Sequence, residues 1–440
     1  MGSLFQDRAC TCPELHVGLD SPTPQQPFRL LVLGGGYGGL SVALNLQDLC
    51  RGQAPRCGPA PEEGAPVVER PRFEVEIVIV DERDGFFHTI GAPLALASED
   101  FASKFWIRYD EIPALRSPNI RVLHGSVKSV DPERKVATYL PYAGTEEKQL
   151  EYDFLVAATG LRRAWPAVPQ SLRRKQYLFE MGDHLRSMTG RKKGVVVVVG
   201  GGAVGIELAS ELKTLHPHLH VILAHSRSQL LSNEPLPDEV KERALELCRD
   251  AGLEVLLNHR LERSEPVKGE AGKVTGAVEV VFTNGKTIVA DRVVMAVSRS
   301  SPNTGFLPRE AVDEEGFVKV QGSLRFSPST IPNSTHHYAI GDIALWSGIK
   351  RCGAAMHMGY YAAHNIHQTM QQIVHGKQEE ELLELKEIPP MIGLAVGKQA
   401  VAYWPENGMI YGEKVLKDFF GEDLGFTICW NHMRLGEEGK

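Results

Sequence analysis

Two glycine-rich turns carry the most informative chemistry of this chain. One spans residues 34–39 (GGGYGG) and the other residues 200–205 (GGGAVG). Each turn follows a short aliphatic run and precedes a segment with the apolar spacing of a helix. Glycines at this spacing let the backbone approach a pyrophosphate, whose charge then lies at the N-terminus of the following helix. The sequence therefore predicts two dinucleotide-binding sites.

An acidic residue completes the first site. Asp81 follows the strand predicted over residues 73–80 and lies 42 positions beyond Gly39. The proline-rich segment 51–71, which accounts for 21 of these positions, is predicted to be a surface insertion. Without this insertion, Asp81 lies about 20 residues beyond the turn, where a carboxylate holds ribose hydroxyls. Since a carboxylate repels a 2′-phosphate, the first site suits FAD or NAD.

The second site has no carboxylate at the corresponding position. His225 lies 20 residues beyond Gly205 and is followed by Ser226 and Arg227. Hydrogen-bond donors and a positive charge suit a 2′-phosphate, so NADPH is favoured over NADH. The alternative for Arg227 is a solvated loop position.

The elements that must position these residues follow from apolar periodicity and turn signals. The turns begin 166 positions apart, which indicates two copies of one βαβ plan and an α/β fold with two Rossmann-like domains. Strands are expected over residues 28–33, 73–80, 121–130, 135–140, 152–158, 195–199, 220–224, 274–282, 287–290 and 292–297, and helices over 40–49, 206–215, 238–251 and 354–373.

We expect four parts along the chain. Residues 1–27 form a flexible leader, residues 28–165 and 299–385 a discontinuous FAD-binding domain, residues 166–298 an NAD(P)H-binding domain, and residues 386–440 a C-terminal α+β interface module. The aromatic residues of that last module suit a core or dimer contact better than a lipid surface. They are Phe419, Phe420, Phe426 and Trp430.

Composition narrows the class of partner. The formal charge is −7 with no long basic run, which argues against nucleic acid. Apolar runs are strand-sized and no secretory signal is visible, so a cytoplasmic protein is expected, with peripheral membrane contact as a further option. Gln6 departs from the myristoylation motif at Gly2.

The cysteines indicate a reducing compartment. All seven are scattered along the chain. The group Cys10, Cys12 and His16 lacks a fourth nearby ligand, so no metal site is assigned.

The order of motifs resembles the FAD-dependent pyridine nucleotide oxidoreductase superfamily. The first turn, Ala158-Thr159-Gly160, the second turn extended to Glu207, and the YAIGD segment 338–342 follow in that family's order. Segments 81–88, 207–231 and 416–435 are similar to the apoptosis-inducing-factor-like branch that includes the ferroptosis suppressor protein, and more distantly to type II NADH dehydrogenases.

This resemblance implies a glutathione-reductase-like fold and a set of cofactor contacts. The Val127 backbone would meet adenine, and Asp342 would bind near the flavin ribityl or phosphate groups. The residues implied for FAD are Gly34, Gly35, Gly36, Tyr37, Gly38, Gly39, Asp81, Val127, Thr159, Gly160, Gly341 and Asp342. Those implied for NAD(P)H are Gly200, Gly202, Gly205, Glu207, His225 and Arg227.

Members of that branch are quinone reductases, so the resemblance implies hydride transfer from NADPH to FAD and then reduction of a quinone-like small acceptor by a monomer or homodimer. The flavin would carry the chemistry. No catalytic residue can be named. The helix containing His357 would direct its N-terminus at the flavin, although a packing role for His357 is the alternative. Glu207 would meet the nicotinamide, with a solvated helix position as its alternative.

Two departures bear on the activity. The superfamily's disulfide reductases carry a CxxC or CxxxxC pair, and this sequence has neither, which disfavours disulfide reduction. An ungapped reading places Leu94 where the ferroptosis suppressor has a flavin-contacting arginine. The alternatives to a quinone reductase are a specialised-metabolism flavoenzyme acting on a biosynthetic intermediate and a non-enzymatic NADPH-sensing flavoprotein.

Overall fold

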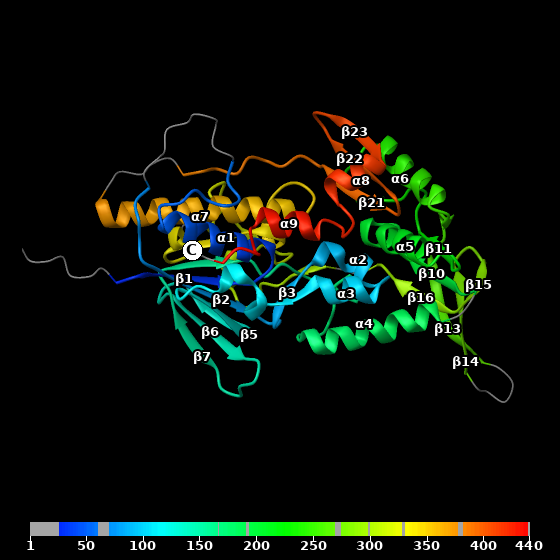
Figure 1. Cartoon of the computed structure of the whole chain (residues 1–440), viewed down its shortest axis with the longest axis horizontal. Coiled ribbons are helices and arrows are strands. Elements are labelled where there is room, and N and C mark those ends of the chain that lie inside the picture. Colours follow the sequence, from blue (N-terminus) through cyan, green and yellow to red (C-terminus); the bar gives the residue numbers. More distant parts are fainter. Residues whose placement is uncertain are drawn as a thin grey trace, which may run out of the picture.

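Two sheets with parallel centres organise the chain, one towards each end of the long axis in Figure 1. The computed structural model describes residues 26–59, 70–165, 167–190, 193–268, 274–297, 300–327, 331–376 and 382–438. Gly2, Cys10, Cys12 and His16 of the expected leader lie outside these residues, as do positions 60–69 of the expected insertion.

The first sheet has seven strands in the order β19-β8-β1-β2-β5-β6-β7. Strands β19 to β5 run parallel, and the last pairs are antiparallel. Strand β1 lies between β2 and β8, so the first glycine turn follows a point where the strand order reverses. The bounds are β1 Phe28–Leu33, β2 Val75–Asp81, β5 Ile120–Asp131, β6 Val136–Pro141, β7 Lys148–Glu151, β8 Phe154–Ala157 and β19 His337–Ala339.

The second sheet repeats this arrangement with four parallel strands in the order β12-β11-β10-β16. Strand β10 lies at its centre and is followed by the second glycine turn. A three-stranded antiparallel sheet, β13-β14-β15, extends from it. The bounds are β10 Val195–Val199, β11 His220–Ala224, β12 Glu254–Leu256, β13 Leu261–Lys268, β14 Val274–Phe282, β15 Thr287–Ala290 and β16 Arg292–Met295.

Helices cover the sheets. Helix α1 (Tyr37–Cys50) packs along α7 (Cys352–His375), where the Ser41 hydroxyl donates a 2.8 Å hydrogen bond to the carbonyl of Met356. A Cβ added to Gly359 would lie 2.7 Å from Ser41 Oγ, so the two helices need glycine there to approach this closely. Helices α5 (Ala203–Leu215) and α6 (Asp238–Asp250) accompany the second sheet.

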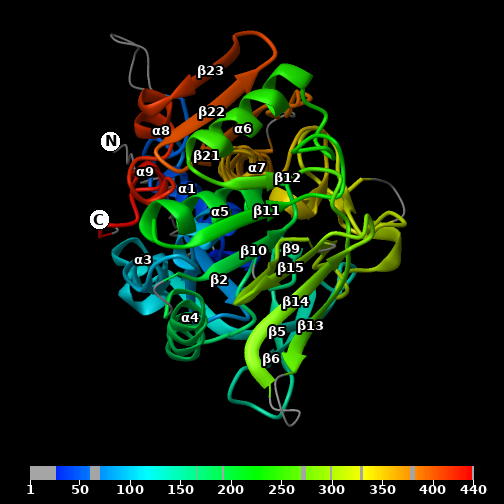
Figure 2. The same cartoon turned by 90° about the vertical axis from the view of Figure 1, so that its right-hand side faces the viewer.

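The C-terminal residues form a small antiparallel sheet and two short helices. They are β21 Ile392–Val396, β22 Gln399–Trp404, β23 Gly408–Gly412, α8 Glu413–Phe419 and α9 Phe426–His432. Figures 1 and 2 show this sheet beside α6, whereas α9 lies near α1. Strand β21 also contacts α5, where the Ala395 N–H lies 3.4 Å from Glu207 Oε1, so the module lies against the second dinucleotide-binding unit as well as near α1.

The predicted elements are present, and five strands have the predicted bounds: 28–33, 195–199, 220–224, 274–282 and 287–290. Between the two domains expected from the sequence, the chain forms β9 (Leu161–Arg162) and the start of α4 (Arg174–Thr189). Within the described residues, none of the helices has the length and apolarity to cross a membrane.

Candidate active site

The first glycine turn is built to leave space at the N-terminus of α1. Gly34 has a φ of +102° and donates a 2.8 Å hydrogen bond to the carbonyl of Val80. A Cβ on Gly39 would lie 1.8 Å from the carbonyl oxygen of Gly34, so only glycine allows α1 to pack this close to the turn. At Gly36, by contrast, no heavy atom of the described residues lies within 4 Å of an added Cβ. This open side suits a pyrophosphate on the helix N-terminus.

The second turn has the same geometry. Gly200, with a φ of +127°, donates a 2.8 Å hydrogen bond to Ala224, and a Cβ on Gly205 would lie 1.8 Å from the carbonyl oxygen of Gly200. An added Cβ on Gly202 again meets no described heavy atom within 4 Å. Both turns therefore present an open helix N-terminus to a ligand.

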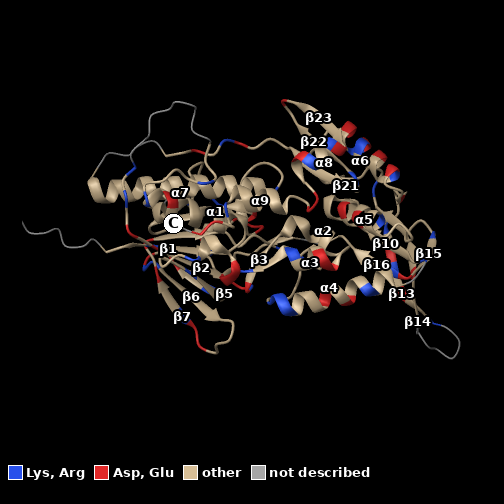
Figure 3. Cartoon of the chain, viewed as in Figure 1, with Lys and Arg blue, Asp and Glu red and all other residues tan. Residues whose placement is uncertain are grey.

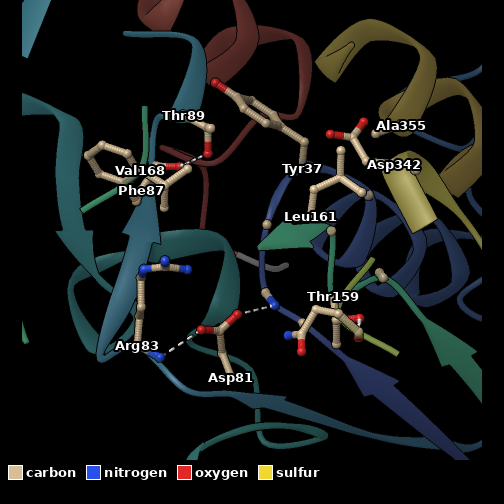
Figure 4. Close-up of a pocket in the computed structure, with 18 of the residues that line it drawn as sticks. Tyr37, Asp81, Arg83, Phe87, Thr89, Thr159, Leu161, Val168, Asp342 and Ala355 are labelled. Atoms are coloured by element: carbon tan, nitrogen blue, oxygen red, sulfur yellow. Dashed lines mark hydrogen bonds between the residues drawn. The ribbon is translucent and has the colours of Figure 1, made fainter. Parts of the chain in front are cut away.

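Asp81 stabilises the first turn through two hydrogen bonds. Its Oδ2 accepts a 2.7 Å hydrogen bond from the Gly35 N–H, and its Oδ1 accepts another from the Arg83 N–H at 2.7 Å. Figure 4 shows both bonds at one end of the cavity. Burial raises the pKa of Asp81, which the charge of Arg83 opposes. The carboxylate thus orders the backbone on both sides of the place where a ribose would bind.

His225 takes the equivalent place in the second turn. Its Nδ1 accepts a 3.1 Å hydrogen bond from the Gly201 N–H, and its Nε2 lies 3.0 Å from Ser232 Oγ. Since Nδ1 accepts, the ring proton is on Nε2; burial also lowers the pKa of His225 and favours this neutral form. Both ring nitrogens of His225 therefore take part in hydrogen bonds. Arg227, two residues further on, is exposed and positively charged.

A cleft of about 230 Å³ runs from the first turn to the start of α7. Ten of the residues predicted for FAD line it: Gly34, Gly35, Gly36, Tyr37, Gly38, Asp81, Thr159, Gly160, Gly341 and Asp342. Gly39 lies behind the turn, and Val127 lines a small adjoining cavity with Gly125 and Phe306. The cleft thus joins most of the predicted set.

The carboxylate of Asp342 lies at the far end of this cleft from Asp81 (Figure 4). Arg163 donates a 3.3 Å hydrogen bond to Asp342 Oδ2. Burial raises the pKa of Asp342, while the charges of Arg163 and Lys350 act to lower it. The position therefore combines a carboxylate with two cations where the ribityl end of a flavin nucleotide would lie.

A second, apolar cavity of about 740 Å³ adjoins the cleft. The cleft and this cavity share Thr89, Ile90, Arg163, Lys350, Arg351 and Cys352. The start of α5 contributes Ala203, Val204 and Glu207, and the C-terminal module contributes Phe419, Phe420, Leu424, Ile428 and Cys429. Figure 3 shows α9 in tan, without Lys, Arg, Asp or Glu, whereas α4 and α6 carry charged residues of both signs. The cavity is where the two dinucleotide sites and the C-terminal module meet.

Glu207 lies in the wall of this cavity. Burial raises the pKa of its carboxyl to about 8, and the nearby Glu211 adds to the effect. The Ala395 N–H donates to Glu207 Oε1 across 3.4 Å, and this interaction partly offsets the rise in pKa. At neutral pH the carboxyl is therefore mainly protonated and can donate a hydrogen bond into the cavity.

Three further positions singled out in the sequence have different surroundings. His357 lines the apolar cavity, with its ring 4.5 Å from that of Tyr361. Leu94 is buried in α2 (Ala92–Ala95), and its neighbour Pro93 is the residue that lines the cavity. Phe426 is buried and packs against the ring of His88 at 5.3 Å, as the predicted core contact requires for this aromatic residue.

Several functional candidates carried no recognisable sequence signal. Arg163, Lys350 and Arg351 lie between the cleft and the cavity, as does Cys352. Arg83 could have been found from its position two residues after Asp81. The described residues include no cluster of three or more His, Cys, Asp or Glu residues suited to a metal.

The two open glycine turns, their ordered strand ends and the cavity between them define a protein that binds two dinucleotides for electron transfer. The chain belongs to the pyridine nucleotide-disulphide oxidoreductase family, whose model matches residues 28–359. It is an FAD-dependent NAD(P)H oxidoreductase by family, related to the apoptosis-inducing-factor-like branch.

Relatives span nearly the whole chain. Oxidoreductase OXR1 of Ajellomyces capsulatus is 47% identical over 99% of this chain and 94% of its own length. Ferroptosis suppressor protein 1 of Homo sapiens is 24% identical over 92% of this chain and 96% of its own.

Solved structures show the same fold. NDH2 of Plasmodium falciparum superposes with a TM-score of 0.63 and 13% identity, covering 93% of this chain and 97% of its own. The sulfide:quinone oxidoreductase of Aquifex aeolicus gives a TM-score of 0.61 and 17% identity, covering 94% and 93%.

Proposed function

We propose that this oxidoreductase takes hydride from NADPH in preference to NADH, passes it to FAD, and reduces a quinone-like small molecule. The FAD-binding domain would comprise residues 28–165 and 299–385, and the NADPH-binding domain residues 166–298. Residues 386–440 would form the C-terminal interface module. The acceptor would bind in the apolar cavity.

The first cleft fits an FAD. Gly36 and its neighbours leave the open cradle for the pyrophosphate, Asp81 holds the adenosine ribose, and Asp342 with Arg163 meets the ribityl end. When bound, the flavin supplies the hydride-accepting and electron-donating chemistry. The residues of the chain bind and orient it.

The apolar cavity is the observation that carries the proposal. It reaches the shared residues of the FAD cleft on one side and the first turn of α5 on the other. Its walls are largely apolar, as suits a quinone ring. The polar residues that line it include Glu207, Arg163 and Lys350, which could donate hydrogen bonds to the carbonyl oxygens of a quinone. The resemblance to the ferroptosis suppressor branch supports the same acceptor class.

The second turn supports the choice of NADPH. A neutral His225 and an exposed Arg227 stand where a carboxylate would select NADH. The positive charge can pair with the 2′-phosphate, and the buried ring keeps the turn ordered.

The test is an anaerobic titration of purified protein with NADPH and with NADH in parallel, followed by addition of a soluble quinone. We expect the flavin absorbance to bleach at lower NADPH than NADH concentration and to return when the quinone is added. An equal response to both nucleotides would remove the NADPH preference. Reduced flavin that ignores every quinone offered would contradict the acceptor and favour the sensor or the biosynthetic flavoenzyme.

A further inference from the structure

The start of the proline-rich segment 51–71 reaches the C-terminal module. Arg56 forms a bidentate ion pair with Asp48 of α1, in which Nη2 and Nε lie 2.7 and 2.8 Å from the two carboxylate oxygens. Its Nη1 donates a 3.3 Å hydrogen bond to the carbonyl of Met433, the residue directly after α9. Arg56 therefore links α1 to a residue 377 positions further along the chain, where α9 lies near α1 in Figure 1.

This contact is buried. The side chains of Arg56 and Asp48 are 8% and 6% exposed, and Met433 is 0% exposed. Both carboxylate oxygens and all three guanidinium nitrogens have hydrogen-bond partners, as a charged pair at this depth requires. Salt screens such a pair much less than a surface pair. The geometry of Arg56 is therefore fixed by its surroundings.

The backbone beside Arg56 is also held in place. The Cys57 N–H donates a 3.0 Å hydrogen bond to Oδ1 of Asn45 on α1. An added Cβ on Gly58 would lie 3.0 Å from the ring of Tyr360 on α7, so the segment packs closely on this helix as well. The position of Arg56 is therefore set by α1 and α7, the two helices whose first residues line the FAD cleft.

Different residues hold the opposite end of α9. Nζ of Lys104, on α3 (Glu99–Phe105), lies 2.6 Å from Oδ2 of Asp423. Nε2 of His88 lies 3.1 Å from the carbonyl of Leu424, which can only accept, so the ring donates this hydrogen bond. Helix α9 is therefore attached to the rest of the protein before its first residue and after its last.

Between these two attachments, α9 forms a wall of the apolar cavity. Leu424, Ile428 and Cys429 line the cavity. The Met433 N–H donates a 3.0 Å hydrogen bond to the carbonyl of Cys429, so the residue that Arg56 holds is one helical turn from the cavity wall. A displacement of Met433 would therefore move the wall itself.

We propose that Arg56 is a positioning residue for the acceptor, because it holds the end of α9 and thereby sets the width of the apolar cavity. The inference rests on the proposed acceptor site. Arg56 itself lines neither the FAD cleft nor the cavity, so its loss acts on the acceptor through α9. Without this contact the acceptor site is complete in a smaller fraction of molecules, which raises the apparent KM for the acceptor and leaves flavin reduction unchanged.

Two variants release α9 at its two ends. Arg56→Lys keeps the cation that Asp48 needs, but the single ammonium group lacks the second branch that reaches Met433. Arg56→Ala is less suitable, because it leaves Asp48 as a buried carboxylate without its cation and so destabilises the fold. Lys104→Met removes the attachment before α9 and should have the same effect through an independent contact.

The first measurement follows α9 by amide hydrogen exchange in full-length protein that retains its flavin. We expect peptides that cover residues 424–435 to exchange about threefold or more faster in Arg56→Lys and in Lys104→Met than in wild type, and peptides of α5 to keep their wild-type rates. Arg116→Ala, at an exposed ion pair beyond the end of α9, is the control and should match wild type. Wild-type exchange of α9 in Arg56→Lys would overturn the proposal whatever the acceptor is.

The second measurement separates flavin reduction from acceptor binding. The rate of flavin reduction by NADPH should be unchanged, whereas KM for a soluble quinone should rise about threefold to tenfold in Arg56→Lys and in Lys104→Met but not in Arg116→Ala. Slower flavin reduction with an unchanged KM would contradict a role in positioning the acceptor. Faster exchange of α9 in a protein whose wild type reduces no quinone would refute the quinone acceptor, and the role of Arg56 in positioning α9 would stand.

Discussion

The backbone N–H of Gly201 donates a 3.1 Å hydrogen bond to Nδ1 of His225. In the first turn the same bond runs from Gly35 to a carboxylate oxygen of Asp81, at 2.7 Å. The same hydrogen bond from the second glycine of the turn is therefore accepted by a neutral ring in one site and by a carboxylate in the other. A neutral acceptor orders the turn without repelling a phosphate, which gives the proposed NADPH preference a specific physical basis.

The first prediction concerns His225→Asp. The new carboxylate can still accept from Gly201, but it repels a 2′-phosphate and accepts from a 2′-hydroxyl. We expect kcat/KM for NADPH to fall by about tenfold or more and that for NADH to rise, since about 1.4 kcal/mol corresponds to a factor of ten. Parallel steady-state kinetics with both nucleotides measure this. Unchanged selectivity would contradict the assignment of His225.

The second prediction concerns Arg227→Ala. A hydrogen bond to a charged group contributes about 1.5–3 kcal/mol, and the exposed position of Arg227 favours the lower end. We expect kcat/KM for NADPH to fall about tenfold while that for NADH changes little. The matched control is Arg249→Ala, an exposed arginine on α6. An equal loss with both nucleotides would show that Arg227 does not read the phosphate.

The third prediction concerns Asp81→Asn. The amide can accept one of the two backbone hydrogen bonds from Gly35 and Arg83, but its NH₂ group opposes the other N–H. We expect the FAD dissociation constant to rise by about 10- to 100-fold, measured by quenching of FAD fluorescence on titration of apoprotein. Asp110→Asn, at an exposed ion pair with Arg108, is the control. Retention of wild-type affinity would exclude Asp81 from the FAD site.

Local patterns were sufficient to predict most of this fold. Each glycine turn lies between a strand and a helix, and Asp81, which ends β2, could be predicted because the proline-rich segment was interpreted as an insertion. These signals depend on neighbours in the chain, where periodicity and turn chemistry operate.

The remaining features depend on long-range packing. The role of His225 as an acceptor requires Gly201 and Ser232 to meet its ring, and the sequence predicted it only as a donor to phosphate. The apolar cavity forms only because α5, α7 and the C-terminal module, which lie far apart in the sequence, converge in the fold.

The fourth prediction concerns the apolar cavity. Ile428 lines it from α9 and is 42% exposed, and Ile410, on β23, has the same exposure but does not line it. Ile428→Asp places a charge in the proposed acceptor site, so we expect KM for a soluble quinone to rise about tenfold, with flavin reduction by NADPH unchanged. Ile410→Asp should leave both constants at wild-type values. Equal effects of the two variants would place the acceptor elsewhere.

The last prediction concerns the carboxyl of Glu207. Burial raises its pKa from 4.5 to about 8. Between these values the unfolded chain loses a proton that the folded protein retains, so stability falls as pH rises through this window and levels off above about pH 8. Glu207→Gln removes this ionisation, so its melting temperature relative to wild type should increase steadily from about pH 5 to about pH 8.

The neighbouring Glu211, whose pKa is raised by a smaller amount, provides a second variant for comparison. Burial raises its pKa to about 7, so the relative gain of Glu211→Gln should level off about one pH unit earlier than that of Glu207→Gln. Glu242→Gln, at an exposed position on α6, should show no such trend. Melting curves in the absence of pyridine nucleotide test all three variants. Glu207→Gln and wild type differing by the same amount at every pH would mean that Glu207 is ionised in the folded protein and cannot donate a hydrogen bond to a quinone oxygen.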